Sequence, residues 1–365
     1  ILFIFMIPAQ WLDLQLSEYK GLVQTLMIKD SSLQSTHSSP LSRIDVVDSP
    51  LVPFRNAPGM SLQSTAAPPE QLAVFLDGDE MTTIDRVKDK ASLAYYDFMT
   101  SALPYHVHQS ANRVLVLKSA TGSQLLQAYY YDIAEIDAVE ADSHLNRLIS
   151  EEYAEYINWQ ALENRVHIHN ISARGYAATD NTHDIVIMGP SGGSTGGSAG
   201  VYALSASYDY TVEALQSYLD LLAPEGILSI TQWTSNPAQG NLKLFITAVK
   251  AMKKNGIEAP ENNIAWIRSW NTATLLLKNT ALTQTEINAI RNFSSKRNFD
   301  LAWLPDIKQD EVNRYQLLQE PLYYLTAASV LQQDNSFINK YKYDLTLATD
   351  NRPFFNNYFK SSSLM

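Results

Sequence analysis

The chain has 365 residues, 45% of them hydrophobic, and its 27 basic and 38 acidic residues give a net charge of −11. This length can bury a substantial core and form two or three structural units. The acidic balance, without any run of Lys or Arg, argues against a nucleic-acid partner, and the absence of cysteine excludes disulfides, cysteine nucleophiles and cysteine-ligated zinc.

The chain begins with a short apolar run. Residues 1–7 are all apolar, and the run stops at Pro8. A membrane-spanning helix needs about 20 apolar residues, and a signal peptide has a basic flank that this run lacks. Two interpretations stay open for residues 1–30. In the first, these residues are the end of a membrane segment that continues upstream, followed by a linker. In the second, the apolar run is a buried strand or the end of a trimmed chain.

Residues 31–90 are expected to form a small, loop-rich β unit. Much of this stretch is rich in Ser, Pro and Thr, with short apolar pieces between. The clearest strand is 72–76, and Asp77-Gly78-Asp79 follows it as a turn, because Asp and Gly tolerate the backbone conformations of tight turns. Apolar residues at helical spacing then predict a helix over 92–103, ended by Pro104.

From residue 113 onward, strands and helices alternate. Apolar segments predict strands at 113–117, 136–140, 184–188 and 227–233, with a further strand at 300–304, and an alternating pattern predicts one at 165–171. Helical patterns lie between them at 122–131, 142–159, 208–222 and 242–254. Strands separated by helices of this length predict a parallel sheet with right-handed crossovers.

Two more strands, 264–270 and 273–277, are joined only by Asn271-Thr272. This link is too short for a helical crossover, so the strands must pair antiparallel as a hairpin. A parallel sheet closed by an antiparallel hairpin is typical of class I methyltransferases, and the ordinary dinucleotide-binding Rossmann domain does not end that way. We therefore predict an α/β fold with a methyltransferase-type Rossmann domain over 91–280 and a mainly helical extension over 281–365.

Four segments resemble spermidine synthases, the polyamine aminopropyltransferase family, and they occur in the family's order. They are the Asp77-Gly78 turn followed by Ala-Tyr-Tyr-Asp-Phe-Met (94–99), the strand Arg-Val-Leu-Val-Leu (113–117), the strand end Asp-Ala-Val-Glu (137–140), and Leu-Ala-Pro-Glu-Gly (222–226) leading to Ile-Thr-Gln-Trp (230–233). The resemblance covers about residues 70–280. It rests on the shared order more than on any single motif.

Segments 17–22 and 348–355 resemble a narrower group, the bacterial spermidine-synthase-like proteins whose N-terminal halves are integral to the membrane. This resemblance implies a membrane-associated soluble domain linked to an upstream membrane segment; without that link, we expect a cytoplasmic protein. Because spermidine synthases are often dimers, it also implies a homodimer.

The family resemblance implies a site for S-adenosylmethionine or its decarboxylated form at the ends of the Rossmann strands. The family's glycine-rich loop is replaced by Lys118-Ser-Ala-Thr-Gly122-Ser, which keeps only Gly122 and puts a long side chain where the nucleoside approaches. Glu140 stands where the family's acid accepts hydrogen bonds from the ribose, although it also fits an exposed acid at a strand end. Ser172 stands where the family contacts the adenine.

The substrate side is altered further. Aminopropyl transfer requires a carboxylate that takes a proton from the attacking amine. The family's Asp-Ser-Ser-Asp is replaced by Gly-Pro-Ser-Gly at 189–192, so we assign no catalytic residue. The resemblance implies that Asp77, Tyr95 and Tyr96 face a small amine substrate. For the two tyrosines, core packing is the alternative interpretation.

Other chemistries are less well supported. Gly-Pro-Ser-Gly-Gly (189–193) matches a nucleophile elbow, but the last histidine, His183, precedes the serine, so a hydrolase triad cannot form in the required order. The pairs His106/His108 and His167/His169 suggest no third ligand, so we expect no metal site. Segment 189–200 contains six of the 14 glycines and is either a flexible loop or a backbone cradle for an anion.

Two classes of function remain open. The first is a transferase that uses S-adenosylmethionine or its decarboxylated form with a redrawn site. The second is a non-catalytic Rossmann module that serves a membrane partner or acts as a sensor. The altered loops at 118–123 and 189–192 favour the second class, and the retained Glu140 favours the first.

Overall fold

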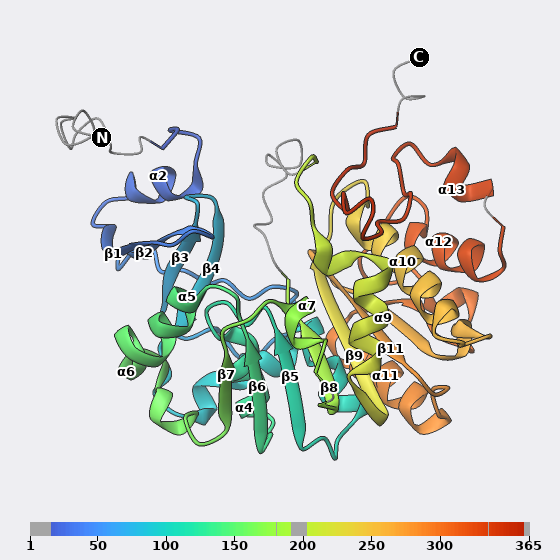
Figure 1. The fold of residues 1–365 in the computed structure, drawn as a ribbon, viewed down its shortest axis with the longest axis horizontal. Helices are drawn as coiled ribbons and strands as arrows, with labels where there is room; N and C mark the ends of the chain where they lie inside the picture. The colour runs from blue at the N-terminus through green and yellow to red at the C-terminus, as the bar shows by residue number, and fades with distance from the viewer. Residues whose placement is uncertain (1–15, 180, 191–202, 335, 361–365) are drawn as a thin grey trace.

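The computed structural model describes residues 16–179, 181–190, 203–334 and 336–360. A small antiparallel sheet near the N-terminus, blue in Figure 1, is connected to a large mixed sheet that forms the centre of the molecule. Within the described ranges, no helix is long and apolar enough to cross a membrane. Residues 1–7, for which we considered a membrane segment, lie outside those ranges, so membrane association stays a prediction.

The small sheet has four strands in sequential order, each antiparallel to the next. They are β1 (Ser32–Ser38), β2 (Arg43–Asp48), β3 (Gln71–Leu76) and β4 (Glu80–Asp85), preceded by the short helix α2 (Gly21–Leu26). The predicted turn joins β3 to β4, with Asp77 and Gly78 at φ values of 51° and 73°. β1 was not predicted from the sequence, because its residues are mostly polar and all of its side chains are exposed or half-buried.

The large sheet has eight strands in the order β12-β10-β11-β9-β8-β5-β6-β7. They are β5 (Arg113–Leu117), β6 (Glu135–Val139), β7 (Val166–His169), β8 (His183–Met188), β9 (Leu222–Trp233), β10 (Ile264–Arg268), β11 (Thr272–Lys278) and β12 (Asp300–Trp303). Strands β5 to β9 are parallel, whereas β11 is antiparallel to both β9 and β10. The predicted class I methyltransferase arrangement, with its closing hairpin, is confirmed.

Helices cover both faces of this sheet. The longer ones are α4 (Ser123–Tyr130), α9 (Val212–Asp220), α10 (Gly240–Lys254), α11 (Gln284–Arg297) and α12 (Leu322–Leu331). The shorter ones are α3 (Leu103–Val107), α5 (Ser143–Arg147), α6 (Ala154–Ile157), α7 (Ala173–Tyr176) and α13 (Ser336–Lys340). Strands buried on both faces must be continuously apolar, which explains why their positions could be predicted from the sequence.

The hydrophobic core of the small sheet is continuous with that of the large one. Ile44 and Val74 of the small sheet belong to the same buried cluster as Val114 and Val116 of β5 and Leu125 of α4. The opposite face of the large sheet is covered by α9 and α10, with α12 in turn packed on α10 (Figure 1). The small sheet therefore packs on the Rossmann domain through a shared core, and it forms one wall of the site described below.

Several predicted helices differ from the structure. The helix expected over 92–103 is instead a 3₁₀ helix, Lys90–Phe98, and Pro104 lies in the first turn of α3, where proline is tolerated. The helix expected over 142–159 is interrupted by a π turn at Leu148–Glu152. The C-terminal extension contributes β12, which pairs with β10, so the large sheet continues beyond residue 280.

Candidate functional site

A cavity of about 330 Å³ lies at the carboxyl ends of the parallel strands. Its floor comes from the loops after β5 and β6 and from the ends of β8 and β9, and its opposite wall comes from β4 and the segment before β3. Open α/β sheets bind ligands at this edge, and small-molecule pockets have about 300–1,000 Å³. We call it the main cavity.

The loop after β5 keeps a backbone that is usual for glycine. Lys118, Ala120 and Gly122 have φ values of 58°, 46° and 87°. The first two are left-handed without being glycine, a conformation that costs about 1–2 kcal/mol per residue. The loop after β5 therefore has left-handed residues at three positions, although only one of them is a glycine.

Gly122 is required by packing as well as by its backbone angle. It precedes α4, and a Cβ added there would lie 3.1 Å from Cδ1 of Ile157. It does not line the main cavity. Its neighbours Thr121 and Ser123 do, so the geometry supports a role of Gly122 in the shape of the loop and gives no support to a direct ligand contact.

Lys118 lines the main cavity, and its ammonium group is paired with an acid. Its Nζ lies 3.1 Å from Oδ2 of Asp209, in the segment before α9. Although desolvation opposes it, the charge of Asp209 raises the pKa of Lys118, with smaller contributions from Tyr210 and Glu140. The side chain thus remains a cation bound to a partner at the rim.

Glu140 lies directly after β6 and lines the main cavity. Its Oε2 accepts a hydrogen bond from the backbone N–H of Ala120 at 3.1 Å, and its Oε1 accepts one from that of Asp142 at 3.0 Å. Glu140 therefore orients the loop after β5 and the loop after β6 at once. An exposed acid without a role would not show these contacts.

Asp142 connects the large sheet to the small one. It caps α5 by accepting from the backbone N–H of His144, and it accepts from the hydroxyls of Ser39 and Ser42 at 2.6 and 3.0 Å. Although burial opposes it, these hydrogen bonds hold the pKa of Asp142 below its usual value. The turn between β1 and β2 is thereby fixed at the mouth of the cavity.

Further lining residues were not singled out from the sequence. Ser119, Gln124 and Trp233 line the cavity, and within the described residues Oγ, Oε1 and Nε1 of these side chains are buried without a hydrogen-bond partner. Trp233 ends the Gln-Trp motif at the end of β9, which was a usable signal. Ser119 belongs to the loop that the family resemblance placed at the site, whereas Gln124 lies in the first turn of α4, where the sequence offered no signal.

Ser172 and Asp77 lie outside the main cavity. Ser172 is exposed and caps α7, its Oγ accepting from the backbone N–H of Gly175 at 3.0 Å. Asp77 is exposed at the turn between β3 and β4, where its Oδ1 accepts from the backbone N–H of Arg43 at 2.9 Å. Neither residue lines the cavity, so the geometry gives no support to the ligand contacts expected of them.

Tyr95 and Tyr96 are interior residues. They are 2% and 0% exposed, and both hydroxyls donate to Oδ2 of Asp85 at the end of β4, at 2.5 and 3.0 Å. Burial raises the pKa of Asp85 and of both tyrosines. The core-packing interpretation describes them correctly, and neither faces a second substrate across the cavity.

One histidine of each pair lies beside a carboxylate. His106 Nε2 lies 2.7 Å from Oδ1 of Asp97, and His169 Nε2 lies 2.7 Å from Oδ1 of Asp137. In the described part of the chain, no group of three or more His, Asp or Glu side chains could hold a metal ion. Gly189 and Pro190 line the main cavity, whereas residues 191–200 of the predicted Gly/Ser-rich loop lie outside the described ranges.

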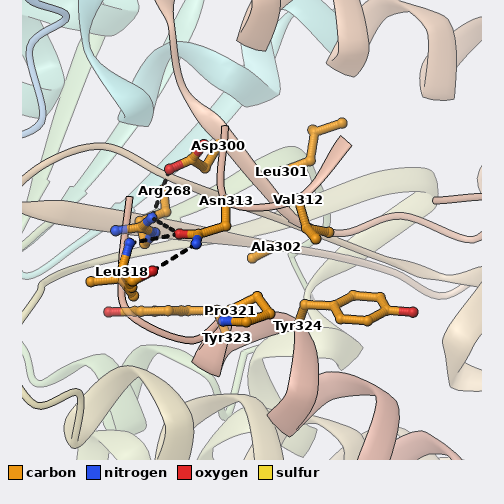
Figure 2. A pocket seen from close by; sticks show the side chains of 10 residues that line it. All are labelled: Arg268, Asp300, Leu301, Ala302, Val312, Asn313, Leu318, Pro321, Tyr323 and Tyr324. Atoms are coloured by element: carbon orange, nitrogen blue, oxygen red, sulfur yellow. Dashed lines mark hydrogen bonds and ion pairs between the residues drawn. The ribbon is translucent and has the colours of Figure 1, made fainter. Parts of the chain in front are cut away.

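A second hollow is structural. Figure 2 shows Arg268 beside Asp300 and Asn313, over the ring of Tyr323. Asp300 also accepts from the backbone N–H groups of residues 314, 315 and 316. The hollow measures about 10 Å³, room for about one water molecule. The contacts of Arg268 and Asp300 anchor the segment after β12, and the hollow between them has no space for a ligand.

No protein-family model matches the chain, and no curated protein sequence is detectably similar to it. Among solved structures it is similar to a spermidine synthase in complex with the transition state analogue AdoDATO, with 15% identity over 81% of this chain and 87% of that one and a TM-score of 0.49. The Thermotoga maritima spermidine synthase is 16% identical over 81% of this chain and 87% of that one, with a TM-score of 0.48. Human methyltransferase-like protein 13 in complex with SAH is 15% identical over 54% of this chain and 88% of that one, with a TM-score of 0.35. At these identities the likeness concerns the fold alone.

Proposed function

We propose that this protein binds a nucleoside ligand, S-adenosylmethionine or its decarboxylated form, in the main cavity. The observation that carries the proposal is the left-handed backbone at Lys118 and Ala120. Strain of this kind is concentrated at ligand sites, where the surrounding structure holds it in place. The strained loop lies at the carboxyl ends of the strands, beside a cavity of suitable size.

The residues present fit the ribose of such a ligand. Each carboxylate oxygen of Glu140 accepts one backbone N–H, which fixes the orientation of the side chain. A carboxylate oxygen has room for a second hydrogen bond, so both oxygens can also accept from ribose hydroxyls. Lys118 leaves the space open, because its ammonium group is bound to Asp209.

The reaction of spermidine synthases is a separate question. When bound, the ligand supplies a carbon activated by its sulfonium, and aminopropyl transfer also needs a base for the attacking amine. Gly189 and Pro190 line the cavity at the end of β8, and the sequence has no Asp or Glu from 185 to 208. We propose that nucleoside binding is retained and that transfer through a carboxylate at this position is lost.

The test is a calorimetric titration with decarboxylated S-adenosylmethionine, S-adenosylmethionine and methylthioadenosine. We expect at least one of them to bind, and Glu140→Gln to weaken that binding about tenfold to a hundredfold, because charge-assisted hydrogen bonds to the ribose contribute about 1.5–3 kcal/mol. Thermal unfolding of the variant without ligand checks that its fold is intact.

Glu135→Gln is the matched control. Glu135 begins the same strand at its opposite end, with a side chain 54% exposed, so its replacement should leave ligand binding unchanged. Absence of binding by the unaltered protein, up to millimolar concentrations of all three ligands, would contradict the proposal.

A further inference from the structure

The main cavity has four charged lining residues, and three of them already have partners. Lys118 pairs with Asp209, both oxygens of Glu140 accept backbone N–H groups, and Asp142 accepts from two serine hydroxyls. The fourth is Glu80, at the start of β4, which is half-buried. Its carboxylate makes no hydrogen bond or ion pair with the residues that the structure describes.

The strand geometry directs Glu80 toward the Rossmann side. Side chains two residues apart share a face of a strand and lie about 7 Å apart, so Glu80 is on the same face as Thr82. The Oγ1 of Thr82 lies 2.8 Å from that of Thr121 in the loop after β5, and the hydroxyl of Thr121 donates to the carbonyl of Thr83. These contacts fix β4 against the loop, and Glu80 lines the cavity between them.

We propose that Glu80 is the cation-binding residue of the main cavity, pairing with an alkyl ammonium or sulfonium group of the ligand. The inference rests on the proposed function. A carboxylate partly removed from water is unfavourable until a counter-charge arrives, and the other lining acids already have partners. The cation has two sources, the side chain of the nucleoside ligand itself or a separate small amine bound beside it.

The experiment compares Glu80→Gln with Asp79→Asn. Both substitutions remove one negative charge from the same hairpin, but Asp79 faces Lys20, 3.5 Å away, and does not line the cavity. Each variant is titrated with decarboxylated S-adenosylmethionine, which is cationic, and with methylthioadenosine, which is neutral. We expect Glu80→Gln to weaken binding of the cationic ligand about tenfold and to leave methylthioadenosine unchanged, whereas Asp79→Asn changes neither.

A second arm separates the two sources of the cation. 1,3-Diaminopropane is titrated onto protein saturated with methylthioadenosine. If a separate amine supplies the cation, it binds the unaltered protein and not Glu80→Gln, while the two nucleosides bind both proteins alike. A preference of the unaltered protein for the cationic nucleoside that declines as salt increases supports the first source without any variant.

The outcomes distinguish the inference from the function on which it rests. If the nucleosides bind and Glu80→Gln changes neither their ratio nor amine binding, the cation role is overturned and the proposed function stands. If no nucleoside binds the unaltered protein, the proposed function and this inference both fall.

Discussion

Asp137 inside the large sheet and Glu80 at the main cavity are carboxylates with opposite surroundings. Asp137 is 3% exposed and accepts from His169 at 2.7 Å, His183 at 2.9 Å and Arg113 at 3.0 Å. Asp137 lies in β6, and its partners His169, His183 and Arg113 lie in β7, β8 and β5. This one carboxylate therefore connects four adjacent strands of the sheet. Glu80 is half-buried and, within the described residues, has no partner.

The difference separates a charge that stabilises the fold from one that is available to a ligand. Although burial opposes it, hydrogen bonds from His183 and His169 and the charge of Arg113 keep the pKa of Asp137 below its usual value. Its hydrogen-bonding capacity is used within the protein. Glu80 lines the cavity and its carboxylate remains able to accept hydrogen bonds from a ligand. Loss of charge should therefore lower stability at Asp137 and ligand binding at Glu80.

The largest effect is expected for Asp137→Asn. The substitution removes the charge and replaces one acceptor oxygen with an NH₂ donor, so Arg113 and two histidines compete for one remaining oxygen. Breaking a buried ion pair costs about 3–5 kcal/mol. We expect the free energy of unfolding, measured by urea denaturation at neutral pH, to fall by about 3 kcal/mol or more. Glu80→Gln should change it by less than about 0.5 kcal/mol.

Glu135→Gln is the control for this prediction. Glu135 faces the same Arg113, with its Oε2 3.6 Å from the guanidinium Nε, but is 54% exposed. Exposed ion pairs contribute about 0–1 kcal/mol, so this variant should remain close to the unaltered protein. Equal, small losses for Asp137→Asn and Glu135→Gln would remove the basis of the comparison.

A buried lysine extends the comparison to a cation, because its contribution to the free energy of unfolding should depend on pH. Lys243 in α10 is 2% exposed, and its Nζ donates to the carbonyls of Phe354 and Asn357 at 3.2 and 3.0 Å. Burial lowers its pKa from 10.5 to about 8. Between these two values the unfolded chain binds more protons than the folded one, so the contribution of Lys243 to stability rises with pH.

We therefore expect the unaltered protein to gain stability relative to Lys243→Met by about 2 kcal/mol between about pH 7.5 and 9.5. Urea denaturation of both proteins at each pH measures the difference, and titration of other groups cancels between them. A difference that stays constant with pH would show that Lys243 is not held in a desolvated state by the C-terminal segment.

The smallest effect concerns the strained loop. Ala120→Gly removes a left-handed alanine, worth about 1–2 kcal/mol, at an entropic cost of about 0.5–1 kcal/mol. We expect a net gain of about 0.5–1 kcal/mol in the free energy of unfolding. Ala128→Gly, inside α4, should instead lose about 1 kcal/mol. A loss at Ala120 as well would show that its backbone angle is not a strain.

The sequence supported the prediction of the large sheet better than that of the helices around it. Most strands from β5 to β9 are rich in apolar residues, β7 alternates apolar and polar residues, and the two-residue link at Asn271-Thr272 admits only a hairpin, so class and topology followed from local patterns. The helix expected over 142–159 was drawn too long, because periodicity alone does not reveal the π turn at Leu148–Glu152.

At the candidate site, Glu140 was predicted because an acid at the end of the second Rossmann strand has a position fixed by the fold. Tyr95 and Tyr96 were misplaced because their partner, Asp85, belongs to β4, a strand that the sequence did not indicate. Glu80 went unnoticed for a related reason, since its importance depends on the neighbouring acids having partners.

Local patterns were sufficient to predict the α/β class and the closing hairpin and to show that no acid follows β8 before residue 209, because each of these features depends on residues that are neighbours along the chain. The pairing of Lys118 with Asp209, the left-handed backbone before α4 and the contrast between partnered and unpartnered carboxylates became visible only in the folded chain. These features depend on pairs of residues far apart in sequence, such as Thr82 with Thr121, which only packing brings together.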